Sequence, residues 1–147
     1  MEKMFKGFYR VIDANINRFK EGIRVVEDVL RYIFEDEAVY KHLKKLRHDI
    51  DEIINKAGID DIQRLKERDS INDIERKNYN KSEFIRDDIF SILIANIRRA
   101  EESLRVLEEL IKLKSPEISL EIKNKRYILY NIEKQIFLSY KKNYEKN

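Results

Sequence analysis

The sequence predicts an all-α protein that folds as a four-helix bundle with pseudo-twofold symmetry, built from duplicated helical hairpins. Three observations predict it. Apolar residues recur with helical spacing through most of the 147 residues. Helix-breaking residues are scarce, with one proline and three glycines. Residues 14–28 and 95–109 are two copies of one helical motif. We expect a single helical domain over residues 1–147, because each hairpin alone would leave an apolar face in water.

The repeated motif carries polar positions as well as apolar ones. At a constant offset of 81 residues the copies share the pairs Asn15/Asn96, Arg18/Arg99, Glu21/Glu102, Arg24/Arg105 and Glu27/Glu108. Any helical protein repeats its apolar positions, but a bundle does not need to repeat these polar ones. The repeat therefore points to a shared function as well as a shared fold.

The first hairpin is expected at about residues 9–57. Its first helix, roughly 9–34, is predicted by one apolar stripe, formed by Ile12, Ile16, Phe19, Ile23, Val26, Leu30 and Ile33. Asp36 is placed to cap the second helix, and Ala57-Gly58 provides its C-terminal stop. The apolar side of that helix is formed by Val39, Leu43, Leu46, Ile50 and Ile53.

A polar connecting loop is expected at 58–81 and the second hairpin at about 82–141. Ser82 is predicted to cap the third helix. The apolar positions of that helix are Phe84, Ile85, Ile89, Leu93, Ile97, Leu104, Leu107 and Ile111. Ser115-Pro116-Glu117 is typical of a helix start, with a capping hydroxyl, a proline at the first position and an acid near the positive end of the dipole. The last helix is expected over about 116–141.

Composition excludes several classes of function. The 31 basic and 28 acidic side chains leave a net charge of +3 with interleaved signs, so we expect no nucleic-acid partner. The sequence has no membrane-spanning apolar run, and its first residues do not resemble a signal peptide, so the expected location is cytoplasmic. Cysteine is absent, and neither a Gly-rich P-loop nor a Gly-x-Gly-x-x-Gly motif occurs.

The duplicated polar residues are the first candidate site. At 100° per residue, Asn15 lies at the edge of the apolar stripe, with Arg18 and Glu21 on its flank. The second copy repeats this geometry with Asn96, Arg99 and Glu102. If the two helices face each other, guanidinium, carboxylate and amide groups meet across one groove and can bind phosphate, a metal ion or a heterocycle. The alternative is that each Arg–Glu pair is an ordinary surface ion pair.

Other residues carry less specific signals. The polar run from Arg68 to Asp73 is either a binding loop or a connector. Arg47 and Arg126 lie beside apolar helix positions, where arginine commonly pairs with a helix carboxylate. The lone histidines and the C-terminal tyrosines are interpreted as structural or core-edge residues, namely His42, His48, Tyr127, Tyr130 and Tyr140.

Several motifs together resemble a known family. Besides the two motif copies, they are Lys45-Leu46-Arg47, Arg68-Asp69-Ser70-x2-Asp73, Arg86-Asp87 and Lys125-Arg126-Tyr127-x2-Tyr130. In order and spacing they resemble the all-helical, monofunctional hydroxymethylpyrimidine phosphate kinases of thiamine biosynthesis, which occur alone or ahead of thiamine-phosphate synthase. The resemblance runs from about residue 9 to residue 136. It departs in one loop, where Ser70 replaces threonine and Ile74-Glu75 replaces Val-Gly.

The resemblance implies transfer of the ATP γ-phosphoryl group to 4-amino-5-hydroxymethyl-2-methylpyrimidine phosphate, with ATP as co-substrate and Mg²⁺. It implies phosphate clamping by Arg18, Arg99, Arg47, Arg126 and Arg68. Asn15 or Asn96 would recognise the pyrimidine, with Glu21 and Glu102 beside them. Asp69 or Asp73 would be the catalytic carboxylate and would hold Mg²⁺. The partners implied are the pyrimidine phosphate and ATP, with a second copy of the chain or a thiamine-phosphate synthase as protein partner.

Two other functions fit parts of the sequence. One is a non-catalytic helical interaction or dimerisation module associated with a thiamine-phosphate synthase. The other is a chorismate mutase-like enzyme, suggested by Leu46-Arg47-x2-Ile50-Asp51, which leaves the duplication unexplained. The chain is too short and too helical to be the synthase barrel itself.

Overall fold

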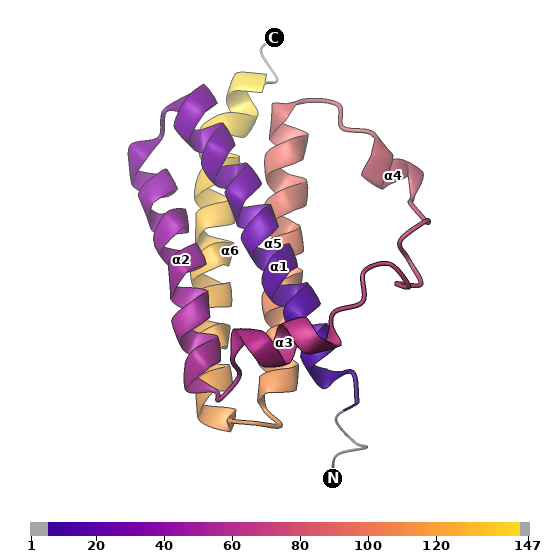
Figure 1. Cartoon of the computed structure of the whole chain (residues 1–147). Coiled ribbons are helices and arrows are strands. Elements are labelled where there is room, and N and C mark those ends of the chain that lie inside the picture. Colours follow the sequence, from indigo (N-terminus) through magenta and orange to yellow (C-terminus); the bar gives the residue numbers. More distant parts are fainter. Residues whose placement is uncertain (1–5, 145–147) are drawn as a thin grey trace.

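Four long helices make up the bundle: α1 (Phe8–Val29), α2 (Glu37–Lys56), α5 (Ile89–Ile111) and α6 (Pro116–Tyr144) (Figure 1). The computed structural model describes residues 6–144, with side chains to residue 141. Within that range it contains no strand, and the all-α fold class is confirmed. None of the helices in the described range has the length and hydropathy needed to cross a bilayer.

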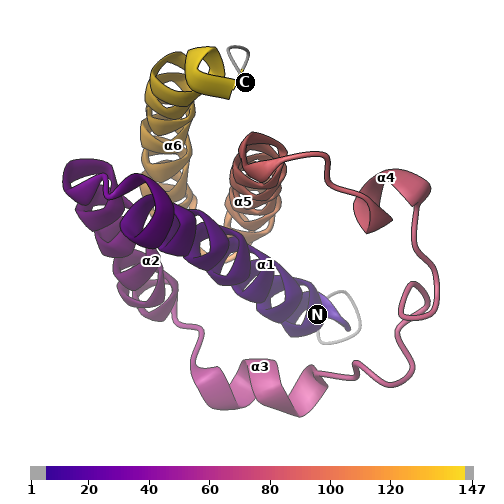
Figure 2. The same cartoon turned by 90° about the horizontal axis from the view of Figure 1, so that it is seen from above.

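The order of the helices explains the long connection in the middle of the chain. α1 packs against α5, as predicted for the two motif helices, and α2 packs against α6 (Figure 2). Since α1 and α5 run in opposite directions, α2 ends at the opposite end of the bundle from the start of α5. The chain must therefore travel the length of α5, about 34 Å for its 23 residues.

We call residues 57–88 the connector. It contains the short helices α3 (Asp61–Glu67) and α4 (Lys81–Phe84). It runs outside the bundle, on the side where α1 and α5 meet (Figures 1 and 2).

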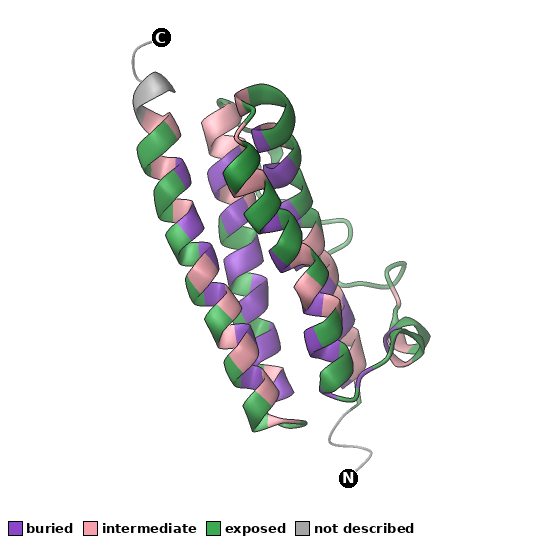
Figure 3. Cartoon of the chain, turned by 90° about the vertical axis from the view of Figure 1, so that its left-hand side faces the viewer, coloured by how far each residue is buried: buried purple, intermediate pink, exposed green. Residues whose placement is uncertain are grey.

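The predicted apolar stripes form the core between the helices (Figure 3). Buried positions include Ile12, Ile16, Phe19, Ile23, Val26, Leu30, Leu43, Leu46, Ile50, Ile53, Leu93, Ile97, Leu104, Leu107 and Ile111. The helices α1 and α5 come very close at Gly22, where a Cβ atom would lie 2.8 Å from the carbonyl oxygen of Asn96 and 3.6 Å from Cβ of Ala100. Only glycine fits this crossing without moving one of the two backbones.

The predicted helix ends are confirmed at three places. The Asp36 carboxylate accepts the Val39 amide at 3.2 Å and caps α2. That helix ends at Ala57, and Gly58 adopts the left-handed φ of 81° typical of this stop. Ser115 Oγ accepts the Ile118 amide at 3.3 Å at the start of α6.

The stripe of the first helix was predicted one turn too far. Ile33 is 53% exposed, because residues Leu30–Phe34 form a π-helical turn. The amide of Asp36 donates to the carbonyl of Leu30 at 2.9 Å across this wider turn. The extra residue rotates Ile33 off the apolar face, and Glu35 at φ 53° then ends the helix.

The predicted start of the third helix at Ser82 is wrong. Helix α5 begins at Ile89, where the carboxylate of Asp88 accepts the Ser91 amide at 2.6 Å as an N-cap. Aspartate competes with the helix for backbone donors and so favours a cap over an interior position. Residues 81–84 form the separate turn α4, and Ile85 is extended. Phe84 and Ile85 are consequently 75% and 50% exposed and lie outside the core.

Two carboxyl groups meet between α5 and α6: Glu101 is buried, and Glu133 is half-buried and lies 3.7 Å from Nε of Arg98. Glu101 is 5% exposed and shares a hydrogen bond with Glu133. Burial, followed by the hydrogen bond and charge of Glu133, raises the pKa of Glu101 from 4.5 to about 9. Oε2 of each side chain is buried, and neither atom has a donor among the described residues. The pair therefore favours a shared proton at neutral pH.

Replacing Glu101 by glutamine should stabilise the protein in alkaline solution. The folded-state pKa is raised, so the contribution of Glu101 is fully present below about pH 4.5 and is lost as the pH rises towards about 9. Glu101→Gln should raise the free energy of unfolding at pH 8 by at least about 1 kcal/mol and flatten its fall between those pH values. Urea unfolding across this range is the measurement, with Glu102→Gln at the exposed neighbour as control. Identical pH profiles for Glu101→Gln and the parent protein would contradict the shared proton.

Candidate functional site

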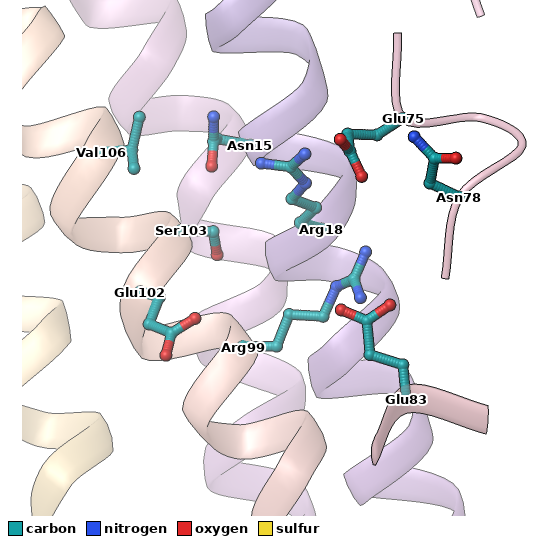
Figure 4. A pocket seen from close by; sticks show the side chains of 9 residues that line it. All are labelled: Asn15, Arg18, Glu75, Asn78, Glu83, Arg99, Glu102, Ser103 and Val106. Carbon is teal, nitrogen blue, oxygen red and sulfur yellow. The ribbon is translucent and has the colours of Figure 1, made fainter. Parts of the chain in front are cut away.

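A pocket of about 500 Å³ opens between α1, α5 and the connector (Figure 4). Its lining combines residues of both motif copies with three connector side chains. We call it the arginine pocket, and its lining residues are Asn15, Arg18, Glu75, Asn78, Glu83, Arg99, Glu102, Ser103 and Val106. Four of the six residues predicted to share one groove, Asn15, Arg18, Arg99 and Glu102, line this pocket.

Arg18 and Arg99 face each other from α1 and α5 and are both exposed. Among the arginines within the described range, these two alone make no hydrogen bond, ion pair or cation–π contact. Arg24, the next arginine of the first copy, pairs instead with Asp28 at 3.8 Å. The lining also carries the carboxylates of Glu75, Glu83 and Glu102, but none of them forms an ion pair with either arginine. Each of the two guanidinium groups can therefore bind an anion in bidentate geometry.

Asn15 provides a buried acceptor beside these arginines. Its side chain is held by a hydrogen bond from Nδ2 to the Val11 carbonyl at 2.9 Å. The residue is 3% exposed, and its Oδ1 has no hydrogen-bond donor. Since an unpaired buried acceptor is costly, a ligand N–H reaching this oxygen would be favoured.

The rest of the two predicted sets divides between pocket and surface. Glu102 lines the arginine pocket, whereas Glu21 is exposed outside its lining. Asn96 repeats the backbone contact of Asn15, donating from Nδ2 to the Ile92 carbonyl at 2.8 Å. Asn96 does not line the arginine pocket. Its backbone carbonyl oxygen lies against Gly22 at the crossing of α1 and α5.

The connector contributes three lining residues to which the sequence assigned no role in the site, Glu75, Asn78 and Glu83. The carboxylate of Glu75 is directed towards Arg18 and that of Glu83 towards Arg99 (Figure 4), without forming an ion pair. Asn78 lies on the same outer side. A loop has no periodicity from which such contacts can be inferred, and here only the crossover topology brings them to the site.

Arg47 and Arg126 lie away from the arginine pocket. Nε and a terminal nitrogen of Arg47 donate to the two carboxylate oxygens of Glu27 at 2.6 and 3.2 Å, linking α2 to α1. Arg126 donates to both carboxylate oxygens of Glu108 at 3.3 Å, linking α6 to α5. Both glutamates are buried. The repeated Glu27/Glu108 positions of the motif thus serve to join the helices within each hairpin.

Arg68 and Asp69 attach the connector to α1. Arg68 donates to both carboxylate oxygens of the buried Asp13 at 2.7 and 2.8 Å, and Arg64 adds a third contact at 3.2 Å. Hydrogen bonds from Asn72 occupy both carboxylate oxygens of Asp69 and hold its pKa below the usual range. Asp13 directly precedes the first motif copy, and the sequence alone assigned it no role.

Asp73 is the second of the two predicted metal ligands. One of its carboxylate oxygens accepts the Glu75 amide at 2.8 Å. Within residues 6–141, no three acidic or histidine side chains gather as a ready-made metal site. Mg²⁺ is commonly held by one or two carboxylates together with substrate phosphates and water, so a single carboxylate here fits that mode of binding.

Comparison with known proteins places the whole bundle in one family. Residues 10–135 match the ThiD2 family. A thiamine-phosphate synthase from Synechocystis sp. is 36% identical over 124 residues, covering 84% of this chain and 34% of that protein. One from Nostoc punctiforme is 33% identical over 135 residues, 92% of this chain and 37% of that protein.

A thiamine-phosphate synthase from Rhodopirellula baltica is 33% identical over 121 residues, which are 82% of this chain and 32% of that protein. This chain thus spans about a third of the length of the curated relatives it matches. No solved structure matches it. Because the family match includes most of each long helix and every residue that lines the arginine pocket, the chain belongs to the ThiD2 family.

Proposed function

We propose that this protein acts in thiamine biosynthesis and transfers the γ-phosphoryl group of ATP to hydroxymethylpyrimidine phosphate, giving the diphosphate. The observation that carries the proposal is the pair Arg18 and Arg99, which face one pocket from the two motif copies without carboxylate partners. Membership of the ThiD2 family and relatives named thiamine-phosphate synthase support the pathway. The resemblance described from the sequence motifs supports the kinase reaction.

The acceptor in this reaction is a phosphate oxygen. It attacks the γ-phosphorus of ATP, the bond from that phosphorus to the β,γ-bridging oxygen breaks, and ADP leaves with the electron pair of that bond. A phosphate monoester loses its second proton with a pKa of about 6. At neutral pH the nucleophile is therefore already anionic and needs no general base.

The catalytic task is then to hold two anions together. Repulsion between acceptor and donor phosphates is reduced by positive charge placed between them, and charge spread over the transferred group is stabilised by the same donors. Arg18 and Arg99 supply this charge in the arginine pocket. The buried Oδ1 of Asn15 would accept a hydrogen bond from the amino group of the pyrimidine, since that acceptor has no other partner.

Asp73 would hold Mg²⁺ through one carboxylate oxygen, with ATP phosphates and water completing the coordination. The ion would neutralise charge on the donor phosphates. Asp69 would position the loop through the hydrogen bonds that its two carboxylate oxygens accept from Asn72.

The choice between phosphorylated and free pyrimidine tests the proposal. With Mg²⁺–ATP, we expect turnover of hydroxymethylpyrimidine phosphate and at least about a hundredfold lower kcat/KM for the free alcohol. The alcohol leaves the two guanidinium groups unmatched, and it also requires a base that the phosphate does not. A coupled assay for ADP release measures both. Comparable rates would contradict the phosphate clamp.

A non-catalytic module is the second candidate, because this chain spans about a third of relatives named as synthases. It predicts no ADP release with either pyrimidine. It also predicts a complex between this chain and a thiamine-phosphate synthase in sedimentation. These two results together would contradict the kinase proposal and support the non-catalytic module.

A further inference from the structure

A second pocket adjoins the arginine pocket along α1. It has a volume of about 390 Å³, and we call it the side pocket. Asn15 and Arg18 border both pockets. The remaining walls come from the start of α1 and from the connector, namely Gly7, Arg10, Val11, Ala14, Asp73 and Ile74. A ligand in the side pocket and one in the arginine pocket would therefore meet at Arg18.

We infer that the side pocket receives the purine base of the nucleotide donor, while the pyrimidine phosphate occupies the arginine pocket. This inference rests on the proposed kinase function and assigns each substrate its place. It follows from the different walls of the two pockets and from the position of the charges between them.

The walls of the side pocket suit the faces of an aromatic ring. Val11 and Ile74 border it and are 40% and 92% exposed, and Ala14 adds a third apolar side chain. The arginine pocket is more polar, with Val106 as its single aliphatic side chain. Ligand sites hold the apolar part of a ligand against hydrophobic side chains, so the larger ring belongs against Val11 and Ile74. Binding a base there would also cover isoleucine surface that is now in water.

The charged residues that border the side pocket are Arg10, Arg18 and Asp73, and the direction of the nucleotide follows from Arg18, which alone of the three also lines the arginine pocket. With the base against Ile74, the triphosphate passes Asp73, where Mg²⁺ is proposed, and ends near Arg18. Arg99 lies beyond Arg18 and lines only the arginine pocket of the two. The γ-phosphate then points into the pocket that holds the acceptor. The reverse arrangement would place the smaller, more polar pyrimidine against the apolar walls.

The variant Ile74→Ser tests whether the side pocket binds the nucleotide or the pyrimidine phosphate. Ile74 is almost fully exposed, so its replacement should leave the fold intact. We expect about tenfold weaker ADP binding by calorimetry with Mg²⁺, and a similar rise in the KM for ATP, because one apolar wall is lost. The KM for the pyrimidine phosphate should stay within twofold. Val11→Ser should behave in the same way from the opposite wall.

Ile71→Ser is the matched control. Ile71 lies in the same loop, is 72% exposed and does not line the side pocket. Unchanged ADP affinity in both Ile74→Ser and Val11→Ser, an equal loss in Ile71→Ser, or a selective loss of pyrimidine phosphate affinity would overturn the inference while leaving the kinase proposal intact. Failure of the parent protein to bind ADP at all would overturn both.

Discussion

Arg18→Ala and Arg99→Ala should each lower kcat/KM for phosphoryl transfer by about a hundredfold or more. Loss of one preformed donor to a developing anion has effects of this size in other enzymes. The urea unfolding midpoint should not change, because neither arginine has a partner in the folded protein. Steady-state kinetics and unfolding of the same preparations measure the two effects separately.

Arg24→Ala is the matched control for these two variants. Arg24 belongs to the same motif and the same helix as Arg18, but it pairs with Asp28 on the surface. Its removal should leave both turnover and stability close to those of the parent protein. If Arg18→Ala and Arg99→Ala behaved like Arg24→Ala, neither arginine would bind a reacting phosphate.

Arg47→Ala should produce the opposite result, a loss of stability without a specific loss of chemistry. Glu27 is fully buried, and Arg47 is the partner that compensates its charge. Breaking a buried ion pair from one side costs about 3–5 kcal/mol of unfolding free energy. Turnover per folded molecule should remain within a few-fold of the parent value.

Two further variants show whether the Arg47 effect comes from the buried pair. Lys41→Ala removes an ion pair with Glu37 whose side chains are 67% and 75% exposed, and it should not shift the midpoint. Glu27→Leu combined with Arg47→Met should recover most of the lost stability, because no buried charge remains unpaired. If the Arg47→Ala protein were as stable as the parent but inactive, Arg47 would have a role in substrate binding and not in stability.

Local chemistry was enough to predict most of the fold. The caps at Asp36 and Ser115 and the stop at Gly58 each depend on one or two residues, and the structure places all three as expected. The errors arose where two local signals compete. Ser82 and Asp88 can both cap a helix, and the choice depends on what the helix then packs against.

The candidate site was predictable only in part, because the repeated motif contains both residues that line the pocket and residues that join neighbouring helices. Arg18 and Arg47 both stand at helix positions beside apolar neighbours, and their residue type does not distinguish them. The difference lies in Glu27, which reaches Arg47 across the hairpin and leaves Arg18 without a carboxylate. That distinction requires the packing of α1 on α2. The connector residues Glu75 and Glu83 required the crossover topology.

The antiparallel crossing of α1 and α5 also bears on how a two-substrate site can arise. If the two hairpins were separate identical chains related by a twofold axis, every side chain at the Asn15 end of the crossing would have to recur at the Asn96 end. Tandem fusion of two hairpin copies removes that constraint. Gly22 and Ser103 already differ at equivalent positions of the repeat. Joining the halves therefore allows the Asn15 end to differ from the Asn96 end, and only the Asn15 end contributes its asparagine to the arginine pocket.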